Sequence, residues 1–346
     1  MSSFSDLLLS YYDENKRPLP WRMNPSPYQV WVSEVMLQQT RIETVKGYYA
    51  SFMDAFPTIK ALAEAEEGKV LKIWEGLGYY LRAKNLQKGA RYVMEGFDGK
   101  LPDSKEELLK IPGIGEYTSS AIASIAFGKP EIALDGNLFR VYSRLNLAYK
   151  SYDDKEARME AMSFFKENIS LDRPGDFNQA LMELGETICL PNGMPLCEQC
   201  PFKEMCLAHF NGEETSLPLP KAKKERERVS LNAFLILHED MVLIRRRPDK
   251  GLLSGTYEFP NYPSDVPVDL ALNELNAEGP ATFLGHGKHV FTHLEWEMDW
   301  YEVKADSMTD AEGCLWVKTS ELKTVYMLPK AFTNFWAGLR LGAGHR

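Results

Sequence analysis

Hydrophobic and polar positions alternate in two different ways along this chain. Up to about residue 210, apolar residues recur every three or four positions, as in SEVMLQQTRIETVKGYYASFM (33–53) and SSAIASIAF (119–127). This spacing predicts amphipathic helices. Glycine and proline interrupt the pattern at PLP, EGLGYY, FDGKLPD and IPGIG. We therefore expect short helices joined by tight turns.

From residue 229 onward the pattern becomes that of β-strands. VSLNAFLILHEDMVLIRRR (229–247) contains two β-rich runs separated by His238, Glu239 and Asp240, which predicts a hairpin. ATFLGHGKHVFTHLEWEMDWYEV (281–303) and GCLWV (313–317) also predict strands, and a short helix is expected over 268–277. The second part of the chain is therefore predicted to be an α+β domain.

A change in composition marks the expected boundary between these parts. NGEETSLPLPKAKKERER (211–228) combines prolines with a dense run of charge and offers little to bury. We predict a helical domain over 1–212, a linker over 213–228 and a second domain over 229–346. No apolar run is long enough for a membrane helix, and no basic segment precedes the N-terminal apolar patch, so a cytoplasmic protein is expected. The formal net charge of −9 argues mildly against nucleic acid, although a local basic groove can persist within an acidic total.

A glycine-containing turn lies between two predicted helices. DSKEELLK (103–110) predicts a helix capped by Asp103 or Ser104, and EYTSSAIASIAF (116–127) predicts the next one. Gly113 and Gly115 lie between them in IPGIG. Glycines at a helix start let a phosphate approach unpaired backbone N–H groups. From the spacing alone, an ordinary helix–helix turn explains the pattern equally well.

Two carboxylates are candidates for acid–base chemistry. Glu34 lies within the apolar stretch YQVWVSEVMLQQT, where poor solvation of the charged form raises the pKa of a carboxyl group. A raised pKa suits a general acid that protonates a leaving group. Asp135 precedes the helical segment LFRVYSRLNLAYK and is predicted to be its N-cap, which is compatible with a carboxylate that faces a cleft.

Four of the five cysteines are clustered. Cys189, Cys197, Cys200 and Cys206 are separated by seven, two and five residues, which predicts a metal site in a reducing compartment. The spacing alone allows either zinc or an iron–sulfur cluster. The remote Cys314 is expected to be a small buried apolar residue.

Three stretches resemble a known family. LLKIPGIGEYTSSAIASIAFG and IALDGNLFR resemble the helix-hairpin-helix DNA glycosylases, and PLPWRMNPSPYQVWVSEVMLQQTRIETV resembles the MutY-type adenine DNA glycosylases. The resemblance extends over essentially the whole chain. It implies a mostly α helix-hairpin-helix N-terminal region with an iron–sulfur loop, followed by an α+β Nudix-like domain. It also implies a monomeric enzyme of the bacterial nucleoid that removes adenine opposite 8-oxoguanine, or opposite guanine, from double-stranded DNA.

The resemblance assigns roles to individual residues. Glu34 would protonate the adenine and then assist water, and Asp135 would stabilise or transiently bond the oxocarbenium-like sugar, as in glycoside hydrolysis. Further residues would support these two (Tyr117 and Asn137), line the pocket of the flipped adenine (Trp21, Arg22 and Leu37), or contact the duplex (Gln39, Thr40, Leu77, Tyr79, Gly113 and Gly115). Without the resemblance, packed aromatics at a helix junction explain Leu77 and Tyr79 better.

Tyr117 stands where lyase-type relatives carry a lysine. A phenol cannot form a Schiff base with an abasic sugar, so weak or no strand cleavage is expected. A bifunctional pyrimidine glycosylase and a non-catalytic damage sensor remain as alternatives. The resemblance also implies a 4Fe-4S cluster on the four cysteines, although the first gap is seven residues where the family has six, and LPNGMPL lacks basic residues for DNA.

The second domain resembles the family at GLLSGTYEFP and HVFTHLEW. Residues 229–346 contain no RExxEE segment, so pyrophosphatase activity is not expected. The family's Phe-Ser-His element, which verifies 8-oxoguanine, corresponds to Phe291, Thr292 and His293. Threonine keeps the hydroxyl group and adds a methyl group, which is expected to shift selectivity over guanine. Without the resemblance, an ordinary strand with outward polar residues explains these positions.

Overall fold

The computed structural model describes residues 3–221, 225–248, 250–291, 293–323, 325–326, 328–333 and 335. The chain divides into two compact units, Met1–Ala222 and Lys223–Arg346, and this division falls inside the segment predicted as a linker. Within the described residues, no helix has the length and apolar character needed to cross a membrane.

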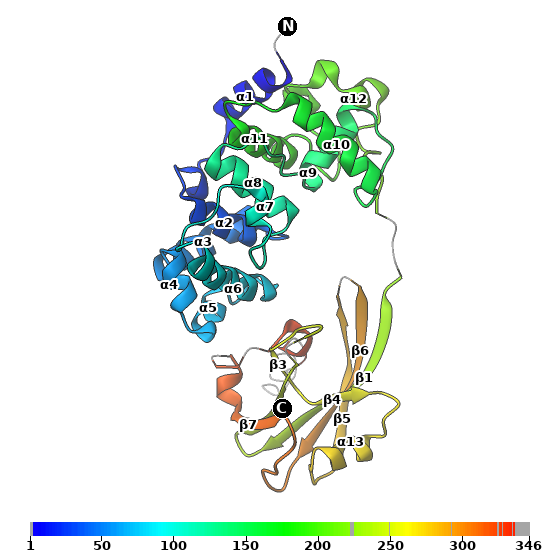
Figure 1. The fold of residues 1–346 in the computed structure, drawn as a ribbon. Coiled ribbons are helices and arrows are strands. Elements are labelled where there is room, and N and C mark those ends of the chain that lie inside the picture. Colours follow the sequence, from blue (N-terminus) through cyan, green and yellow to red (C-terminus); the bar gives the residue numbers. More distant parts are fainter. Residues whose placement is uncertain are drawn as a thin grey trace. The chain divides into compact units, whose positions relative to one another are not determined.

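The first unit is built from helices (Figure 1). Their bounds are α1 Phe4–Asn15, α2 Pro27–Leu37, α3 Ile42–Ala55, α4 Ile59–Glu64, α5 Glu67–Ile73, α6 Leu81–Gly96, α7 Lys105–Leu108, α8 Glu116–Phe127, α9 Gly136–Leu145, α10 Lys155–Asn168, α11 Pro174–Thr187 and α12 Leu207–Asn211. The sequence sets many of these helix starts. Ser26 and Gln29, for example, form a capping box before α2, with Pro27 in its first turn.

Two hydrophobic cores organise this unit. One collects residues from α2 to α8, including Trp31, Phe52 and Trp74. The other collects residues from α1 and from α9 to α11, including Phe139 and Phe177. The first core contains residues from 19–36 and the second contains residues from 132–188. Where the two cores adjoin, side chains from residues 19–42 and 134–186 line a common cavity.

The predicted helix-hairpin-helix is confirmed. Ser104 caps α7 by accepting a hydrogen bond from the Glu107 N–H, and α8 covers the predicted residues 116–127. Gly113 adopts a φ of +85°, and a Cβ placed there would lie 2.8 Å from the Cβ of Asn85 on α6. A glycine is therefore required at 113 by backbone conformation and by the close approach of α6.

The predicted linker is wrong in its first half. Leu217 is buried, and its carbonyl accepts a hydrogen bond of 2.9 Å from Nε of Arg144. The Leu219 N–H donates to the Lys150 carbonyl at 3.1 Å. The Leu217 side chain and the Leu219 backbone are thus held on the helical unit, where Arg144 on α9 supplies a cationic partner, whereas the Leu219 side chain is 40% exposed. Such a partner could not be seen in the local sequence.

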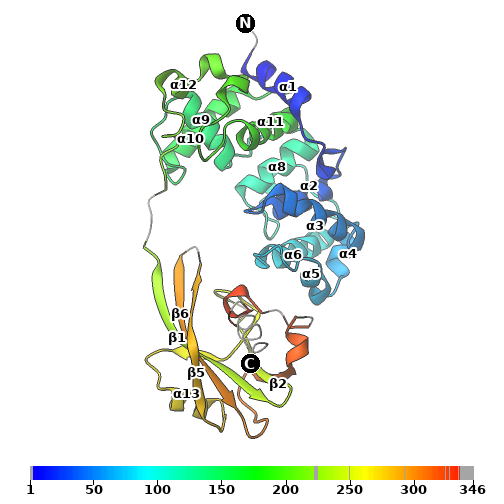
Figure 2. The ribbon, with the colours of Figure 1, turned by 180° about the vertical axis from the view of Figure 1, so that it is seen from behind.

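The second unit contains a mixed sheet and a short helix (Figure 2). Its elements are β1 Glu227–His238, β2 Met241–Arg246, β3 Tyr257–Glu258, β4 Asn261–Pro263, α13 Val268–Glu274, β5 Ala281–Val290, β6 Leu294–Lys304, β7 Cys314–Lys318 and the 3-10 helix η4 Thr319–Lys323. The strand order is β3-β2-β1-β6-β5, with β4 paired to β1 and β7 paired to β2. β1 and β6 are parallel, and the other pairs are antiparallel.

Alternation along β1 gives the sheet two apolar faces. Phe234 and Ile236 face α13, while Ala233 and Leu235 pack with Trp300 and Phe332 on the other side. The predicted hairpin between β1 and β2 is confirmed, with His238 paired to Met241. The predicted strands are also present, but α13 ends at Glu274, before the predicted 277, because Asn276 turns the chain with a φ of +49°.

Candidate active site

A cavity of about 590 Å³ lies between the two cores of the helical unit. Its lining comes from the segment before α2, the C-terminal half of α2, the start of α8, the start of α9 and one face of α11. Most residues assigned by resemblance meet there: Trp21, Arg22, Glu34, Leu37, Gln39, Thr40, Gly115, Tyr117, Asp135 and Asn137. The fold therefore brings together side chains that lie about a hundred positions apart in the sequence.

Glu34 is a buried acid on α2. Glu34 is 5% exposed, and the Tyr117 hydroxyl donates a hydrogen bond of 2.7 Å to its Oε2. Burial raises the pKa of Glu34 to about 7, and the negative charge of Asp135 acts in the same direction. The Tyr117 hydroxyl and Arg22 partly oppose this shift. Near neutral pH a substantial fraction of Glu34 is therefore protonated, as general-acid chemistry requires.

Tyr117 itself keeps its proton. Burial, followed by the charges of Glu34 and Asp135, raises the pKa of the phenol well above its ordinary value. Tyr117 therefore acts as a hydrogen-bond donor that fixes the Glu34 carboxyl group, and not as a base or nucleophile.

Asp135 caps α9, as predicted. Oδ1 accepts the Leu138 N–H at 2.8 Å, and Oδ2 accepts Nδ2 of Asn137 at 2.9 Å. Burial raises the pKa of Asp135, whereas these hydrogen bonds and the charge of Arg140 favour the carboxylate. Both oxygens have donors directed at them, an arrangement that suits an ionised group.

Arg140 is a supporting residue that was not found from the sequence. Its Nη2 donates to Oδ1 of Asn137 at 2.9 Å and to the Gly185 carbonyl at 2.7 Å, while Nε donates to the Cys189 carbonyl at 2.7 Å. Because the Asn137 oxygen faces Arg140, its amide N–H₂ faces Asp135. The available signal was an arginine within the apolar run LFRVY, which required a buried partner.

The residues predicted to contact the duplex differ in how far they are exposed. Gln39 and Tyr79 have positive φ values of 56° and 48°, and Tyr79 is 57% exposed. Leu77 does not project: it is 6% exposed and belongs to the first core. The prediction that Leu77 wedges into the duplex disagrees with this conformation. Gly76 and Gly78 both have positive φ, and the chain turns between them so that the Leu77 side chain packs in the first core.

Arg82 on α6 connects the end of α2 with the turn at residues 77–78, and it was not predicted from the sequence. Its guanidinium donates to the Met36 carbonyl at 2.9 Å, to the Thr40 hydroxyl at 3.2 Å and to the Gly78 carbonyl at 3.2 Å. Arg82 thus satisfies carbonyls at the end of α2, which would otherwise lack partners. Burial lowers the pKa of Arg82 to about 10, so it remains charged at neutral pH.

The two glycines of the hairpin are expected to respond differently to substitution. Gly115 has φ −101° and ψ −175°, a conformation open to any residue, and a Cβ there would meet nothing within 4 Å. Gly115→Ala should therefore leave the melting temperature unchanged but weaken DNA binding, since a methyl group would cover the N–H groups at the start of α8. Gly113→Ala should lower the melting temperature by several degrees. Thermal melts and fluorescence anisotropy with a duplex would measure both; unchanged affinity in Gly115→Ala would contradict phosphate binding here.

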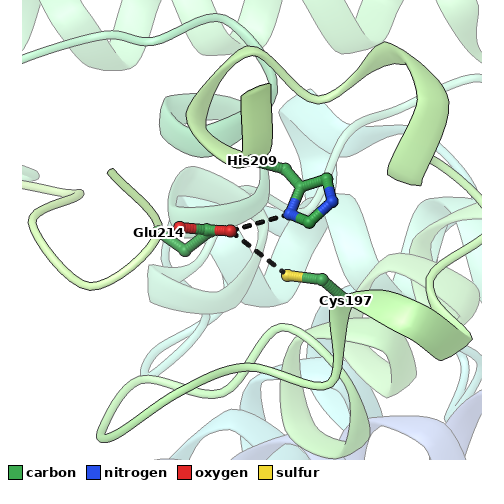
Figure 3. Close-up of side chains that lie close together, drawn as sticks. All are labelled: Cys197, His209 and Glu214. Carbon is green, nitrogen blue, oxygen red and sulfur yellow. Dashed lines mark hydrogen bonds and ion pairs between the residues drawn. The ribbon is translucent and has the colours of Figure 1, made fainter. Parts of the chain in front are cut away.

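The four clustered cysteines line one cavity together with apolar side chains such as Val141, Leu184 and Phe202. Arg144 donates to Sγ of Cys189 at 3.2 Å, a favourable contact for a thiolate. Among the described residues, the only three ligand-type side chains within 4.8 Å of one another are Cys197, His209 and Glu214 (Figure 3). A zinc ion bound by thiolates at about 2.3 Å would place its sulfurs roughly 3.8 Å apart. In the described residues, no three of the four cysteine sulfurs lie within 4.8 Å of one another, as the ligands of a single zinc ion would.

His209 and Glu214 also line this cavity. Nδ1 of His209 lies 2.7 Å from Oε1 of Glu214, and Sγ of Cys197 lies 4.0 Å from the same oxygen (Figure 3). The remaining cysteine, Cys314, lies on β7 and is partly buried against the α13 face of the sheet.

The predicted 8-oxoguanine element lies at the turn between β5 and β6, and not within a strand. Phe291 packs edge-on against Trp296 with ring centroids 5.0 Å apart, and its N–H donates to the Leu294 carbonyl. His293 is exposed, and its carbonyl accepts from the Glu227 N–H. Thr292 lies outside the described residues. A hairpin turn presents its tip to a partner more readily than a strand does.

Comparisons with known proteins agree with this arrangement. Residues 32–167 match the HhH-GPD superfamily of base excision DNA repair proteins, and residues 232–338 match the NUDIX domain family. The adenine DNA glycosylase of Homo sapiens is 34% identical over 94% of this chain and 72% of its own length. The adenine DNA glycosylase of Schizosaccharomyces pombe is 30% identical over 98% of this chain and 90% of its own.

A solved structure supports the helical fold. A thermostable thymine-DNA glycosylase superimposes with a TM-score of 0.54 at 26% identity, covering 60% of this chain and 95% of that one. The two relatives extend over nearly the whole chain, including the sheet-containing unit. This chain is accordingly a member of the adenine DNA glycosylase family, within the helix-hairpin-helix superfamily of base excision DNA repair proteins.

Proposed function

We propose that this protein removes adenine mispaired with 8-oxoguanine, or with guanine, from duplex DNA by acid-assisted hydrolysis of the N-glycosidic bond. The observation that carries the proposal is Glu34, an acid with a pKa of about 7 that faces a cavity of about 590 Å³. A cavity of this size accommodates an extruded purine. Its wall supplies aromatic, aliphatic and cationic side chains in Trp21, Leu37 and Arg22.

The two carboxylates divide the chemistry. Glu34 donates its proton to the adenine ring, so that the base leaves as a neutral molecule when the bond to C1′ breaks. The positive charge that develops on the sugar is stabilised by the Asp135 carboxylate. Water then adds to C1′, and its proton returns to Glu34, which restores the acid for the next cycle.

The identity of Tyr117 supports the proposal that the enzyme is monofunctional and has weak or no lyase activity. The position after the hairpin carries a phenol that is hydrogen-bonded to Glu34 and buried, instead of an amine that could attack an abasic sugar. The products are then free adenine and an intact strand with an abasic site.

One assay separates the candidate activities. Excess protein is incubated with a duplex carrying adenine opposite 8-oxoguanine, and each sample is divided and treated with or without alkali. Strand breaks only after alkali support the proposal. Breaks without alkali, accompanied by an adduct trapped with borohydride, would indicate a bifunctional lyase. Tight binding without any adenine release would leave only a damage sensor.

We further propose that Cys189, Cys197, Cys200 and Cys206 hold a 4Fe-4S cluster. The proposal is supported by four thiols around one largely apolar cavity and by the cationic donor Arg144. A bound cluster would supply structural cross-links and an electron-transfer centre. The seven-residue first gap forms a loop, of which Met194 is 67% exposed, so the extra residue lies at the surface. Iron and inorganic sulfide with visible absorption are expected, and zinc as the sole metal would refute this assignment.

The tip of the β5–β6 hairpin is the proposed reader of 8-oxoguanine. His293→Ala should reduce the preference for 8-oxoguanine over guanine by roughly tenfold if the side chain contributes one hydrogen bond to the base. The fold should be unaffected, because His293 is exposed and its recorded hydrogen bond is made by the backbone. Excision rates with both opposing bases measure the ratio. Ser264→Ala in the same unit serves as a control, since only its backbone N–H is recorded in a hydrogen bond.

A further inference from the structure

Behind the wall of the cavity lies a buried carboxylate that the proposed mechanism does not use. Glu183 on α11 has a side chain with no solvent exposure. Nε of Arg17 donates to Oε1 at 2.5 Å, Nη2 of Arg17 donates to Oε2 at 3.1 Å, and Nη1 of Arg22 donates to Oε2 at 2.7 Å. In the described part of the chain Arg22 and Glu186 line the cavity, whereas Glu183 is not part of its lining.

Among the described residues, the hydrogen bonds of Arg22 are made by Nη1 alone. Its Nη1 is occupied by Glu183 and, at 3.5 Å, by the Arg17 carbonyl. The guanidinium also packs over the Tyr12 ring at 5.6 Å from the centroid. An arginine has five N–H donors. With one edge fixed by Glu183, the remaining donors of Arg22 are left for an occupant of the cavity.

We propose that Glu183 is a positioning residue for the adenine pocket, which fixes the Arg22 guanidinium at the cavity wall and neutralises its charge there. The inference rests on the proposed adenine glycosylase function. A rigid donor pair at the wall would recognise ring nitrogens of a purine, and geometric precision of this kind depends on the residues that support the contacting group.

Charge gives the second part of the argument. Glu34 faces Tyr117, Asp135, Arg22 and Glu186, and the positive charge of Arg22 favours the ionised form of Glu34. Glu183 faces Arg17 and Arg22. Burial opposes ionisation of Glu183, but these two arginines outweigh it and hold its pKa below the ordinary value. An ionised Glu183 therefore limits how strongly Arg22 draws the proton away from Glu34.

Two substitutions should move the titration of Glu34 in opposite directions. Glu183→Gln removes the compensating charge, so the alkaline limb of the rate–pH profile should shift down by about one pH unit. Arg22→Gln removes the cation, so the limb should shift upward by a similar amount. In the double variant the limb should match that of Arg22→Gln alone, because Glu183 acts through Arg22.

The experiment measures the single-turnover rate at which the full-length protein releases adenine from a duplex, over a range of about pH 5 to 9. In parallel, NMR of ¹³C-labelled glutamate follows the Glu34 carboxyl, whose signal is assigned by its loss in Glu34→Gln. Asp13→Asn is the matched control: it breaks a bidentate ion pair between α1 and the residue preceding α11, at 2.8 and 2.7 Å, without contacting Arg22. Glu183→Asp, which keeps the charge, covers the case in which Glu183→Gln does not fold. It should keep the position of the limb and lose rate roughly tenfold through misplacement of Arg22.

The two failures are distinguishable. If the native protein releases no adenine, the proposed function fails, and the NMR titration alone decides the role of Glu183. An unchanged Glu34 titration in Glu183→Gln would overturn the inference. So would a shift of equal size in the presence and absence of Arg22, because Glu183 would then act independently of that guanidinium.

Discussion

Replacing Glu34 by glutamine should reduce the single-turnover rate of adenine release by about three to four orders of magnitude. Glutamine keeps the size of the side chain and can accept the Tyr117 hydrogen bond, but it has no proton to donate. The residual rate should no longer depend on pH near neutrality. In the native protein, by contrast, the rate should fall as pH rises through about 7, where Glu34 ionises.

The same substitution should increase stability at alkaline pH. The folded-state pKa of Glu34 is raised from 4.5 to about 7, so folding disfavours the charged form. Below about pH 4.5 the group is neutral in both states and the two proteins should be equally stable. Above about pH 7 the native protein is destabilised by roughly 3 kcal/mol at most, and the glutamine variant is not. Urea unfolding at pH 5 and 8.5 measures the difference; a variant that is less stable at both would mean that Glu34 is not held neutral by burial.

Replacing Asp135 by asparagine should separate catalysis from folding. Asparagine caps a helix about as well as aspartate, so the Leu138 N–H keeps its acceptor, but the hydrogen bond from Asn137 is lost. The melting temperature should therefore fall by less than in Asp135→Ala, in which both acceptors are lost. The carboxylate charge is lost, however, and the rate of adenine release should fall about a thousandfold. Asp135→Ala should lose both the activity and about 1 kcal/mol of stability, because the start of α9 is left without a cap.

Product analysis completes this test. Adenine release at the native rate in Asp135→Asn would remove the second carboxylate from the mechanism. Binding of the damaged duplex should remain within a few fold of native, since Asp135 lies in the cavity and not on the exposed surface.

The elements that were predicted correctly are those with strong local signals. The hairpin between α7 and α8, the cap at Asp135 and the β1–β2 turn each depend on a few residues whose preferences point the same way. The resemblance to adenine DNA glycosylases, based on motifs spread along the chain, is confirmed by the comparisons.

The features that were not predicted depend on contacts distant in sequence. Arg82 and Glu183 are charged residues whose local sequence resembles a solvated helix position, and Arg140 stands in an apolar run that does not identify its partners. Their partners lie more than forty positions away in most of their recorded contacts. Leu77 was misplaced because its backbone turns inward between two glycines with positive φ, a geometry that residue types alone do not specify.

The hydrogen bonds that hold the Leu217 and Leu219 backbone limit how far the second unit can move from the helices. Five residues separate Lys221 from Glu227, the first residue of β1, and a fully extended chain spans at most about 3.5 Å per residue. The first residue of β1 therefore lies at most about 20 Å from Lys221, which keeps the second unit at a high effective concentration near the helical unit. Arg144 holds the Leu217 carbonyl and also donates to Sγ of Cys189. A change at the cysteine cavity that displaces Arg144 would release the Leu217 carbonyl and so lengthen the connection between the two units, even with Glu34 and Asp135 in place.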